Sequence, residues 1–279
     1  MQNFISKPMA AGFIMLCLFA KTNAQTLSRE TVLIETPYGS MKIKLYEETP
    51  LHKANFLKLA ASKFYDSLMF HRVINSFMIQ GGDPDSKYAK PGDTLGNGEI
   101  GYTLPAEFRP GIIHKKGRLC AARESDDINP KAESSACQFY IVMGKKRTME
   151  DLGKYEERIN KTHYTNCARE FMKTNEGKAL KQQYSRLKTE NKTDSAAMIN
   201  EKIDGLIQAE HLKTPVYKFS RQQIDVYTTA GGTPHLDGTY TVFGEVVEGL
   251  DVIDKIGAVK TDKQGRPLQD VRMKVTLLQ

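Results

Sequence analysis

The sequence predicts a mainly β domain interrupted by an α-helical insertion, and three observations carry this prediction. Apolar and polar residues alternate by twos near both ends of the chain, as in Met41, Ile43 and Leu45 near the start. Glycine, proline and asparagine break residues 69–144 into short segments, which is typical of short strands and turns. In residues 145–230 glycine and proline become scarce and long polar side chains dominate, which favours exposed helices.

The composition excludes several other classes of protein. The chain has 279 residues, of which 40% are hydrophobic and 26% charged, so it is too apolar for a disordered protein. Glycine does not recur at a regular period, which excludes a collagen-like protein. Only one long apolar run occurs, which excludes a polytopic membrane protein.

Residues 1–24 are typical of a secretory signal peptide. Residues 10–20 form an uncharged apolar run that is too short to span a bilayer comfortably. Thr22 and Ala24 place small residues at the −3 and −1 positions of a cleavage site. The large Leu16 precedes Cys17, so plain export is favoured over a retained anchor or a lipid on that cysteine. We expect no stable membrane insertion once the signal is removed.

The first domain segment, residues 25–144, begins with a hairpin and a helix. Two alternating runs flank Pro37-Tyr38-Gly39-Ser40 and predict a half-buried β-hairpin. Thr49-Pro50 then predicts a helix start, with Thr49 as the N-cap and proline in the first turn. Short strands follow, and residues 231–279 return to the same alternation, so these two segments are predicted to form one discontinuous domain.

The insertion, residues 145–230, is predicted to contain several helices. One apolar helical face combines Ile199, Ile203, Leu206 and Ile207. The helix starts are predicted at Thr148 with Asp151, at Thr165, at Asp194, and at a capping box of Ser220 and Gln223.

The positive charge of the chain belongs to this insertion. The formal net charge is +7, and the insertion holds 17 lysines and arginines against 12 acidic residues. The rest of the chain after residue 24 is balanced, with 21 of each sign. The insertion's lysines are spread among glutamates, as on a solvated helical face, and they form no basic stripe interleaved with aromatic residues of the kind that binds nucleic acid. We therefore expect no nucleic-acid partner, and a protein partner for the insertion stays open.

The sequence does not support a dinucleotide-binding site or a metal site. Residues 96–101 match G-x-G-x-x-G but lack the flanking strand and helix of a dinucleotide site. The six histidines show no metal-ligand spacing, so no metal and no cofactor is expected. After signal cleavage three cysteines remain; Cys120 and Cys137 fit buried core positions, although a disulfide between them stays open.

Residues 70–83, FHRVINSFMIQGGD, form the most informative segment. The run alternates apolar residues with one arginine and one glutamine, and ends in two glycines before an Asp-Pro turn. Arg72 is unusual among Phe70, Val73 and Ile74, because a guanidinium is costly to bury without an acceptor. An edge strand with a snorkelling arginine would explain it without any function.

This segment resembles the signature of the cyclophilin-type peptidyl-prolyl cis-trans isomerases. Three further segments continue the resemblance in the family's order: residues 114–123, residues 134–141 and residues 234–244, the last lying after the insertion. The resemblance covers essentially all of the discontinuous domain, whereas the insertion matches no family. It implies a closed eight-stranded antiparallel barrel with two capping helices.

The resemblance also implies the site residues. Arg72, Phe77 and Gln80 are expected to form the catalytic group, with Arg72 at its centre. Phe77, Met78, Tyr140 and Leu236 are expected to line a proline pocket. Gln80 and Gln138 would bind substrate backbone or hold Arg72, and Ala122 and Arg123 would contact the residue before the proline. Tyr240 is expected in the groove wall. His235 is also expected among the substrate-binding residues of the groove. It stands where many eukaryotic members carry the tryptophan that binds cyclosporin, so weak cyclosporin binding is expected.

The predicted function is thus rotation about X-Pro peptide bonds in proline-containing polypeptides, assisting the folding of exported proteins in a bacterial periplasm or cell envelope. Such a reaction breaks no bond, so it needs no nucleophile, metal or cofactor. The alternative is a catalytically weak proline-peptide binding module or chaperone, in which the helical insertion is the main interaction surface.

Overall fold

The computed structural model describes residues 31–278, so the predicted signal peptide lies outside the described residues. The strands are β1 (Thr31–Thr36), β2 (Gly39–Leu45), β3 (Arg72–Ile74), β4 (Met78–Gly81), β5 (Thr103–Leu104), β6 (Arg118–Ala121), β7 (Ser134–Ser135), β8 (Phe139–Val142), β9 (Val242–Glu248) and β10 (Lys274–Leu277). The helices are α1 (Pro50–Ala61), α2 (Met149–Lys173), α3 (Asn175–Thr189), α4 (Thr193–His211), α5 (Arg221–Thr229) and α6 (Leu250–Gly257), with short 3₁₀ helices η1 (Pro84–Tyr88) and η2 (Pro234–Leu236).

Eight of these strands form one curled antiparallel sheet, in the order β10-β1-β2-β9-β6-β8-β4-β3. The predicted closed barrel is wrong, because the sheet remains an open half-barrel whose edge strands β10 and β3 form no ladder with each other. The facing segments are too irregular for one: a single bridge joins Met69 to Arg272, with a few backbone bonds such as Phe70 N–H to the Val271 oxygen at 2.9 Å. Two short strands, β5 and β7, pair separately.

Strand alternation places the core on the concave face of this sheet. Val73, Ile79, Ile141 and Leu119 occupy matching positions on β3, β4, β8 and β6, and all four are buried. The predicted hairpin is present as β1 and β2, where Ile34 faces Met41 across the ladder. Burying such a side chain contributes about 1.5–3 kcal/mol, so this row stabilises the sheet on which the opposite face is displayed.

Local signals located most helix starts. The α1 helix begins at Pro50 after Thr49, as predicted, and the capping boxes at Thr148 and Ser220 are both formed. The α4 helix begins at Thr193, one residue before the predicted Asp194. The predicted start at Thr165 is wrong: its hydroxyl donates to the Lys161 carbonyl oxygen at 2.9 Å inside α2, so the helix continues through it.

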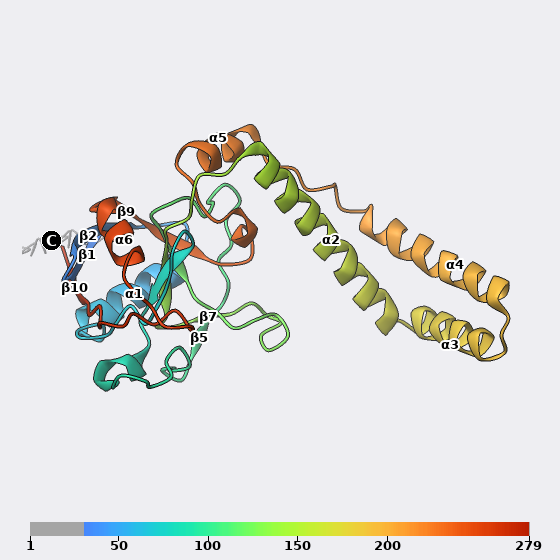
Figure 1. The fold of residues 1–279 in the computed structure, drawn as a ribbon, viewed down its shortest axis with the longest axis horizontal. Coiled ribbons are helices and arrows are strands. Elements are labelled where there is room, and N and C mark those ends of the chain that lie inside the picture. Colours follow the sequence, from blue (N-terminus) through green and yellow to red (C-terminus); the bar gives the residue numbers. More distant parts are fainter. Residues whose placement is uncertain (1–30, 279) are drawn as a thin grey trace, which may run out of the picture.

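The helices α2, α3 and α4, which we call the helical arm, extend away from the sheet (Figure 1). Ile203 and Ile207 of α4 are buried against Leu180 of α3 and apolar residues of α2, which confirms the predicted apolar face. Nearer the sheet, a second cluster joins Leu152 of α2, Phe219 and Tyr227 to Ile113. We call it the junction cluster. The arm therefore has its own small core and a separate attachment to the sheet.

The two ends of the inserted segment cross in direct contact. Gly144 has a φ of +57°, and a Cβ placed there would lie 2.5 Å from the Gly232 Cα. Lys145 and Gly232 form an isolated antiparallel bridge, and the Arg147 guanidinium donates to the Gly232 carbonyl oxygen at 3.1 Å. Only glycines permit so close an approach of the two backbones. Both ends of the inserted segment therefore leave the sheet at the same point.

Within residues 31–278 the model has no helix that is both long enough and apolar enough to cross a bilayer.

Candidate active site

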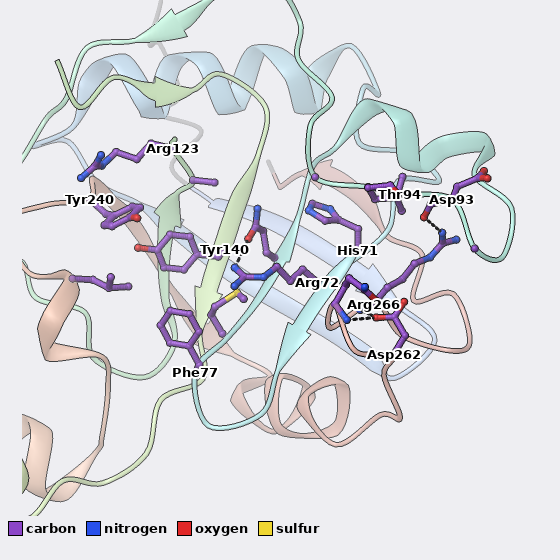
Figure 2. Close-up of a pocket in the computed structure, with 18 residues that line it drawn as sticks. His71, Arg72, Phe77, Asp93, Thr94, Arg123, Tyr140, Tyr240, Asp262 and Arg266 are labelled. Atoms are coloured by element: carbon purple, nitrogen blue, oxygen red, sulfur yellow. Dashed lines mark hydrogen bonds between the residues drawn. The ribbon is translucent and has the colours of Figure 1, made fainter. Parts of the chain in front are cut away.

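A cavity of about 530 Å³ opens on the convex face of the sheet (Figure 2). Nine of the predicted site residues line it: Arg72, Phe77, Met78, Gln80, Ala122, Arg123, Tyr140, Leu236 and Tyr240. Gln138 lines an adjoining hollow that shares Gln80, Ala122 and Arg123 with the first. These residues come from distant parts of the chain, and the fold brings them to one face.

The register of the sheet explains why the polar residues meet. Arg72 pairs with Gln80 across β3 and β4, and Gln80 pairs with Tyr140 across β4 and β8. Residues directly opposite in a ladder share a face, so these three form a row one position away from the buried row of Val73, Ile79 and Ile141. The alternation that fills the core therefore also displays the site.

A chain of amides holds Arg72. Its Nη1 donates to Gln80 Oε1 at 3.2 Å, and Gln80 Nε2 donates to Gln138 Oε1 at 3.1 Å. Gln138 Nε2 then donates to the carbonyl oxygens of Gly96 and Gly98, at 3.0 and 2.9 Å. This series of hydrogen bonds ends on backbone carbonyl oxygens, so the Arg72 guanidinium is held in place by neutral groups alone.

The charge of Arg72 is not neutralised by an acid. In the described part of the chain no carboxylate oxygen lies within 4.0 Å of its guanidinium, although 17 pairs of a lysine or arginine with a carboxylate are present elsewhere. The neighbouring pocket is lined by the apolar side chains of Phe77, Met78 and Leu236. A half-buried cation with free N–H donors beside an apolar pocket can bind a group that becomes electron-rich.

Tyr140 is held by a second network that reaches the inserted segment. Its hydroxyl lies 3.1 Å from His114 Nε2, and His114 Nδ1 lies 2.9 Å from Asp237 Oδ1. The hydroxyl of Tyr227, in α5, donates to Asp237 Oδ2 at 2.6 Å. Burial raises the pKa of both Tyr140 and Tyr227, so both phenols stay protonated and act as hydrogen-bond donors.

The opposite wall of the cavity comes from η2 and the loop after it. Leu236 and Tyr240 line the wall, and the Arg123 guanidinium lies over the Tyr240 ring at 4.6 Å. Arg123 Nε also donates to the Thr239 carbonyl oxygen at 2.8 Å. Tyr240 in turn packs edge-on against Tyr140, with ring centroids 5.9 Å apart.

His235 does not line the cavity. Its ring stacks on Phe77 and on Tyr155 of α2, with centroids 5.6 Å away in both cases. Burial, together with the nearby Arg158 and Arg147 cations, lowers the pKa of His235 to about 4, so the ring is neutral at pH 7. The residue supports a wall of the pocket and links it to the helical arm.

The cavity extends past Arg72 to residues that sequence reasoning did not select. His71, the loop 92–96 and the loop carrying Asp262 and Arg266 form this end, on the far side of Arg72 from Phe77 and Tyr140 (Figure 2). Arg266 Nη1 donates to the Asp93 carbonyl oxygen at 2.6 Å and ties the two loops together. Burial lowers the pKa of His71 to about 4. No sequence pattern signals these loops, since only tertiary contacts bring them beside Arg72.

Metal-ligating side chains do not gather in this cavity. Among residues 31–278 one group of three potential ligands exists, and it lies in the helical arm. Cys120 and Cys137, whose pairing the sequence left open, are separate buried thiols, and burial raises the pKa of each.

The family described as "Cyclophilin type peptidyl-prolyl cis-trans isomerase/CLD" matches residues 31–277. The chain belongs to the cyclophilin-type peptidyl-prolyl cis-trans isomerases. This membership confirms the predicted family and the predicted class of enzyme.

Individual similar proteins carry names from the same family. A "Putative peptidyl-prolyl cis-trans isomerase" of Staphylococcus aureus (strain USA300) is 26% identical over 241 residues, covering 86% of this chain and 87% of that protein. A "Putative bifunctional phosphatase/peptidyl-prolyl cis-trans isomerase" of Streptococcus pyogenes serotype M6 is 27% identical over 257 residues, which are 91% of this chain but 39% of that longer protein. A crystal structure of a cyclophilin type isomerase from Cryptosporidium parvum shares the fold, with a TM-score of 0.50 and 18% identity over 90% of this chain and 98% of that one.

Proposed function

We propose that this cyclophilin-type isomerase acts on X-Pro bonds of exported polypeptides and that Arg72 is its catalytic residue. The observation that carries the proposal is the unneutralised guanidinium of Arg72, held by Gln80 next to an apolar pocket. The export part rests on the predicted signal peptide, and the polypeptide substrate rests on the family.

The chemistry requires only selective binding of a twisted amide. Rotation about an X-Pro bond has a barrier of roughly 18–20 kcal/mol, because resonance gives the bond partial double-bond character. In the twisted transition state the prolyl nitrogen loses conjugation and becomes a better hydrogen-bond acceptor. A fixed cationic donor stabilises that state more than either planar ground state, and the rate rises accordingly.

The other residues that line the cavity have separate roles in binding the substrate. Phe77, Met78 and Leu236 offer an apolar pocket for the proline ring. Gln80 positions Arg72, so it acts through the guanidinium. Ala122 lines the same cavity and is expected to contact the residue before the proline, while Arg123 is engaged with Tyr240 and the Thr239 carbonyl oxygen. Arg123 therefore shapes that end of the groove through its packing.

The test is the variant Arg72→Ala, compared with the wild type in an isomerase assay on an Xaa-Pro tetrapeptide. We expect kcat/KM to fall by about 10²–10³-fold, the usual loss when one electrostatic donor to a transition state is removed. Arg186→Ala, an exposed arginine of α3, is the matched control and is expected to retain activity. Far-ultraviolet circular dichroism checks that both variants fold.

Two outcomes would overturn the proposal. A folded Arg72→Ala variant with near-wild-type turnover would remove Arg72 from the mechanism. A wild-type chain that binds proline peptides saturably but turns none over would instead favour a binding module.

A further inference from the structure

Three potential metal ligands converge inside the helical arm, far from the cavity. His163 and Cys167 lie four residues apart on α2, so both point from the same side of that helix. His211 is the last residue of α4. One ligand atom from each of the three lies within 4.8 Å of the others. No local pattern marks this group, since Cys167 and His211 are 44 positions apart and only the packing of α2 against α4 brings them together.

The distances suit a tetrahedral ion. Cys167 Sγ lies 3.9 Å from His163 Nδ1, close to the roughly 3.6 Å that zinc bonds of about 2.3 Å to sulfur and 2.0 Å to nitrogen require. His163 Nδ1 and His211 Nδ1 lie 2.7 Å apart, against about 3.3 Å around a bound ion, so the two rings need to separate by about 0.6 Å. All three side chains are partly exposed, and His211 ends its helix, so this small movement is accessible.

We propose that His163, Cys167 and His211 form a binding site for a zinc ion. Two imidazole nitrogens and one thiolate are the ligand types that zinc prefers, and three protein ligands leave the fourth tetrahedral position to water. On binding, Cys167 releases its thiol proton to solvent, and each histidine contributes the lone pair of one ring nitrogen. The mechanism of isomerisation does not use this site.

A zinc ion at this position would stabilise the packing of the helical arm. Cys167 also packs on the apolar cluster of Leu180, Ile203 and Ile207, so the site borders the small core of the arm. A bound ion would fasten the end of α4 to the middle of α2, where the chain leaves the arm to return to the sheet (Figure 1). Zinc would thus stabilise the arm independently of the junction cluster.

The competing explanation is a hydrogen-bonded histidine pair beside a packed thiol, with no affinity for metal. Calorimetric titration of the full chain, purified without a polyhistidine tag, with zinc chloride separates the two. We expect one zinc ion per chain and a higher melting temperature in its presence. Cobalt(II) substitution should give a thiolate-to-metal charge-transfer band, which reports coordination by sulfur directly.

The variants His163→Gln, Cys167→Ser and His211→Gln each remove one ligand. We expect each to weaken zinc binding by at least about 100-fold, since even changes to outer-shell partners cost about 10- to 100-fold. Asn166→Ala, an exposed neighbour on α2, is the matched control and should bind zinc as the wild type does. Circular dichroism without metal checks helicity. Wild-type zinc affinity in all three ligand variants, or a cobalt complex without the charge-transfer band, would overturn the site.

Discussion

The two sides of the groove are built in different ways. The floor carries Arg72, Gln80 and Tyr140 in one row of the sheet. Gln80 and Tyr140 lie in strands that are paired on both sides, whereas Arg72 lies in the edge strand β3, which is paired with β4. The wall carries Leu236 and Tyr240 on η2 and the loop after it, with no ladder beneath them. Side chains from the inserted segment support the wall instead: the Tyr155 ring stacks on His235, and the Tyr227 hydroxyl bonds to Asp237.

This difference assigns separate physical roles to the two regions. The floor holds the charge that is proposed to act on the transition state, and ladder hydrogen bonds make its geometry stiff. The wall completes the apolar pocket that is proposed to hold the proline ring, and its shape depends on how α2 and α5 pack. Changes in the floor should therefore alter stability and turnover together, whereas changes in the wall or arm should alter binding or local order.

The largest effect on stability is expected from shortening a buried side chain in the core layer beneath the floor. Ile141 is fully buried between Leu119 and Ile79 in the row behind Tyr140. We expect Ile141→Ala to lower the free energy of unfolding by about 2–5 kcal/mol, because it removes apolar contacts and leaves a cavity. Urea denaturation followed by circular dichroism measures the change, and tetrapeptide turnover should fall as the floor loosens.

The matched variant is Ile203→Ala in the arm, whose side chain is also buried. We expect hydrogen exchange to rise in α3 and α4 while tetrapeptide turnover stays near the wild-type value. Equal loss of turnover in both variants would show that arm and floor form one cooperative unit, contrary to the division proposed here.

The same division separates what the sequence could and could not predict. Arg72, Phe77, Met78 and Gln80 lie within nine residues of one another, so a single local motif revealed most of the floor. The alternation of strand residues predicted the hairpin of β1 and β2 for the same reason. Closure of the barrel was predicted wrongly, because it depends on whether segments more than 190 residues apart extend far enough to pair.

Tertiary packing alone determines the remaining parts of the site. The sequence suggested His235 as a groove residue, but its ring stacks between Phe77 and Tyr155 of α2 and does not line the cavity. The loops that carry Asp93 and Arg266 were missed, since nothing local marks them as neighbours of Arg72. The ligand group of the arm was missed for a similar reason, because its spacing is visible only after α2 and α4 pack together.

Acid should destabilise both ends of the groove, and the end that carries His71 more strongly. Burial lowers the pKa of His71 and of His235 to about 4, from an ordinary value of 6.5. The unfolded chain therefore binds more protons than the folded chain between those values. Stability should be full above about pH 6.5 and should fall as the pH drops through that window towards 4. The limit for the buried His71 is about 3 kcal/mol, whereas His235 is partly exposed and contributes less.

The contributions can be separated with His71→Phe and His235→Phe, each of which keeps an aromatic ring but cannot titrate. Neither ring nitrogen of His71 makes a hydrogen bond with the described residues, so phenylalanine loses no bond there. We expect the difference in urea midpoint between pH 7.5 and pH 4.5 to shrink most in His71→Phe. An unchanged difference in that variant would exclude His71 as a source of acid sensitivity.

The smallest effect is expected from the link between the arm and the wall. Tyr155 of α2 stacks on His235 and lies under the Arg147 guanidinium, which is 5.4 Å from its ring centroid. Such an aromatic contact is worth about 0.5–1.5 kcal/mol. We therefore expect Tyr155→Ala to raise KM for a tetrapeptide by about 2- to 10-fold, because the wall that carries Leu236 loses its support. The value of kcat should change little, since the contacts of Arg72 with the floor remain.

Saturation kinetics on the tetrapeptide separate KM from kcat, with Tyr184→Ala on α3 as the matched control outside the junction. A fall in kcat with unchanged KM in Tyr155→Ala would mean that the arm acts on the catalytic floor and not on the wall. An unchanged KM and kcat would mean that η2 keeps its position without α2, through the bond of Tyr227 to Asp237. Only a selective rise in KM supports a division in which the sheet supplies the catalytic charge and the inserted helices supply the shape of the pocket.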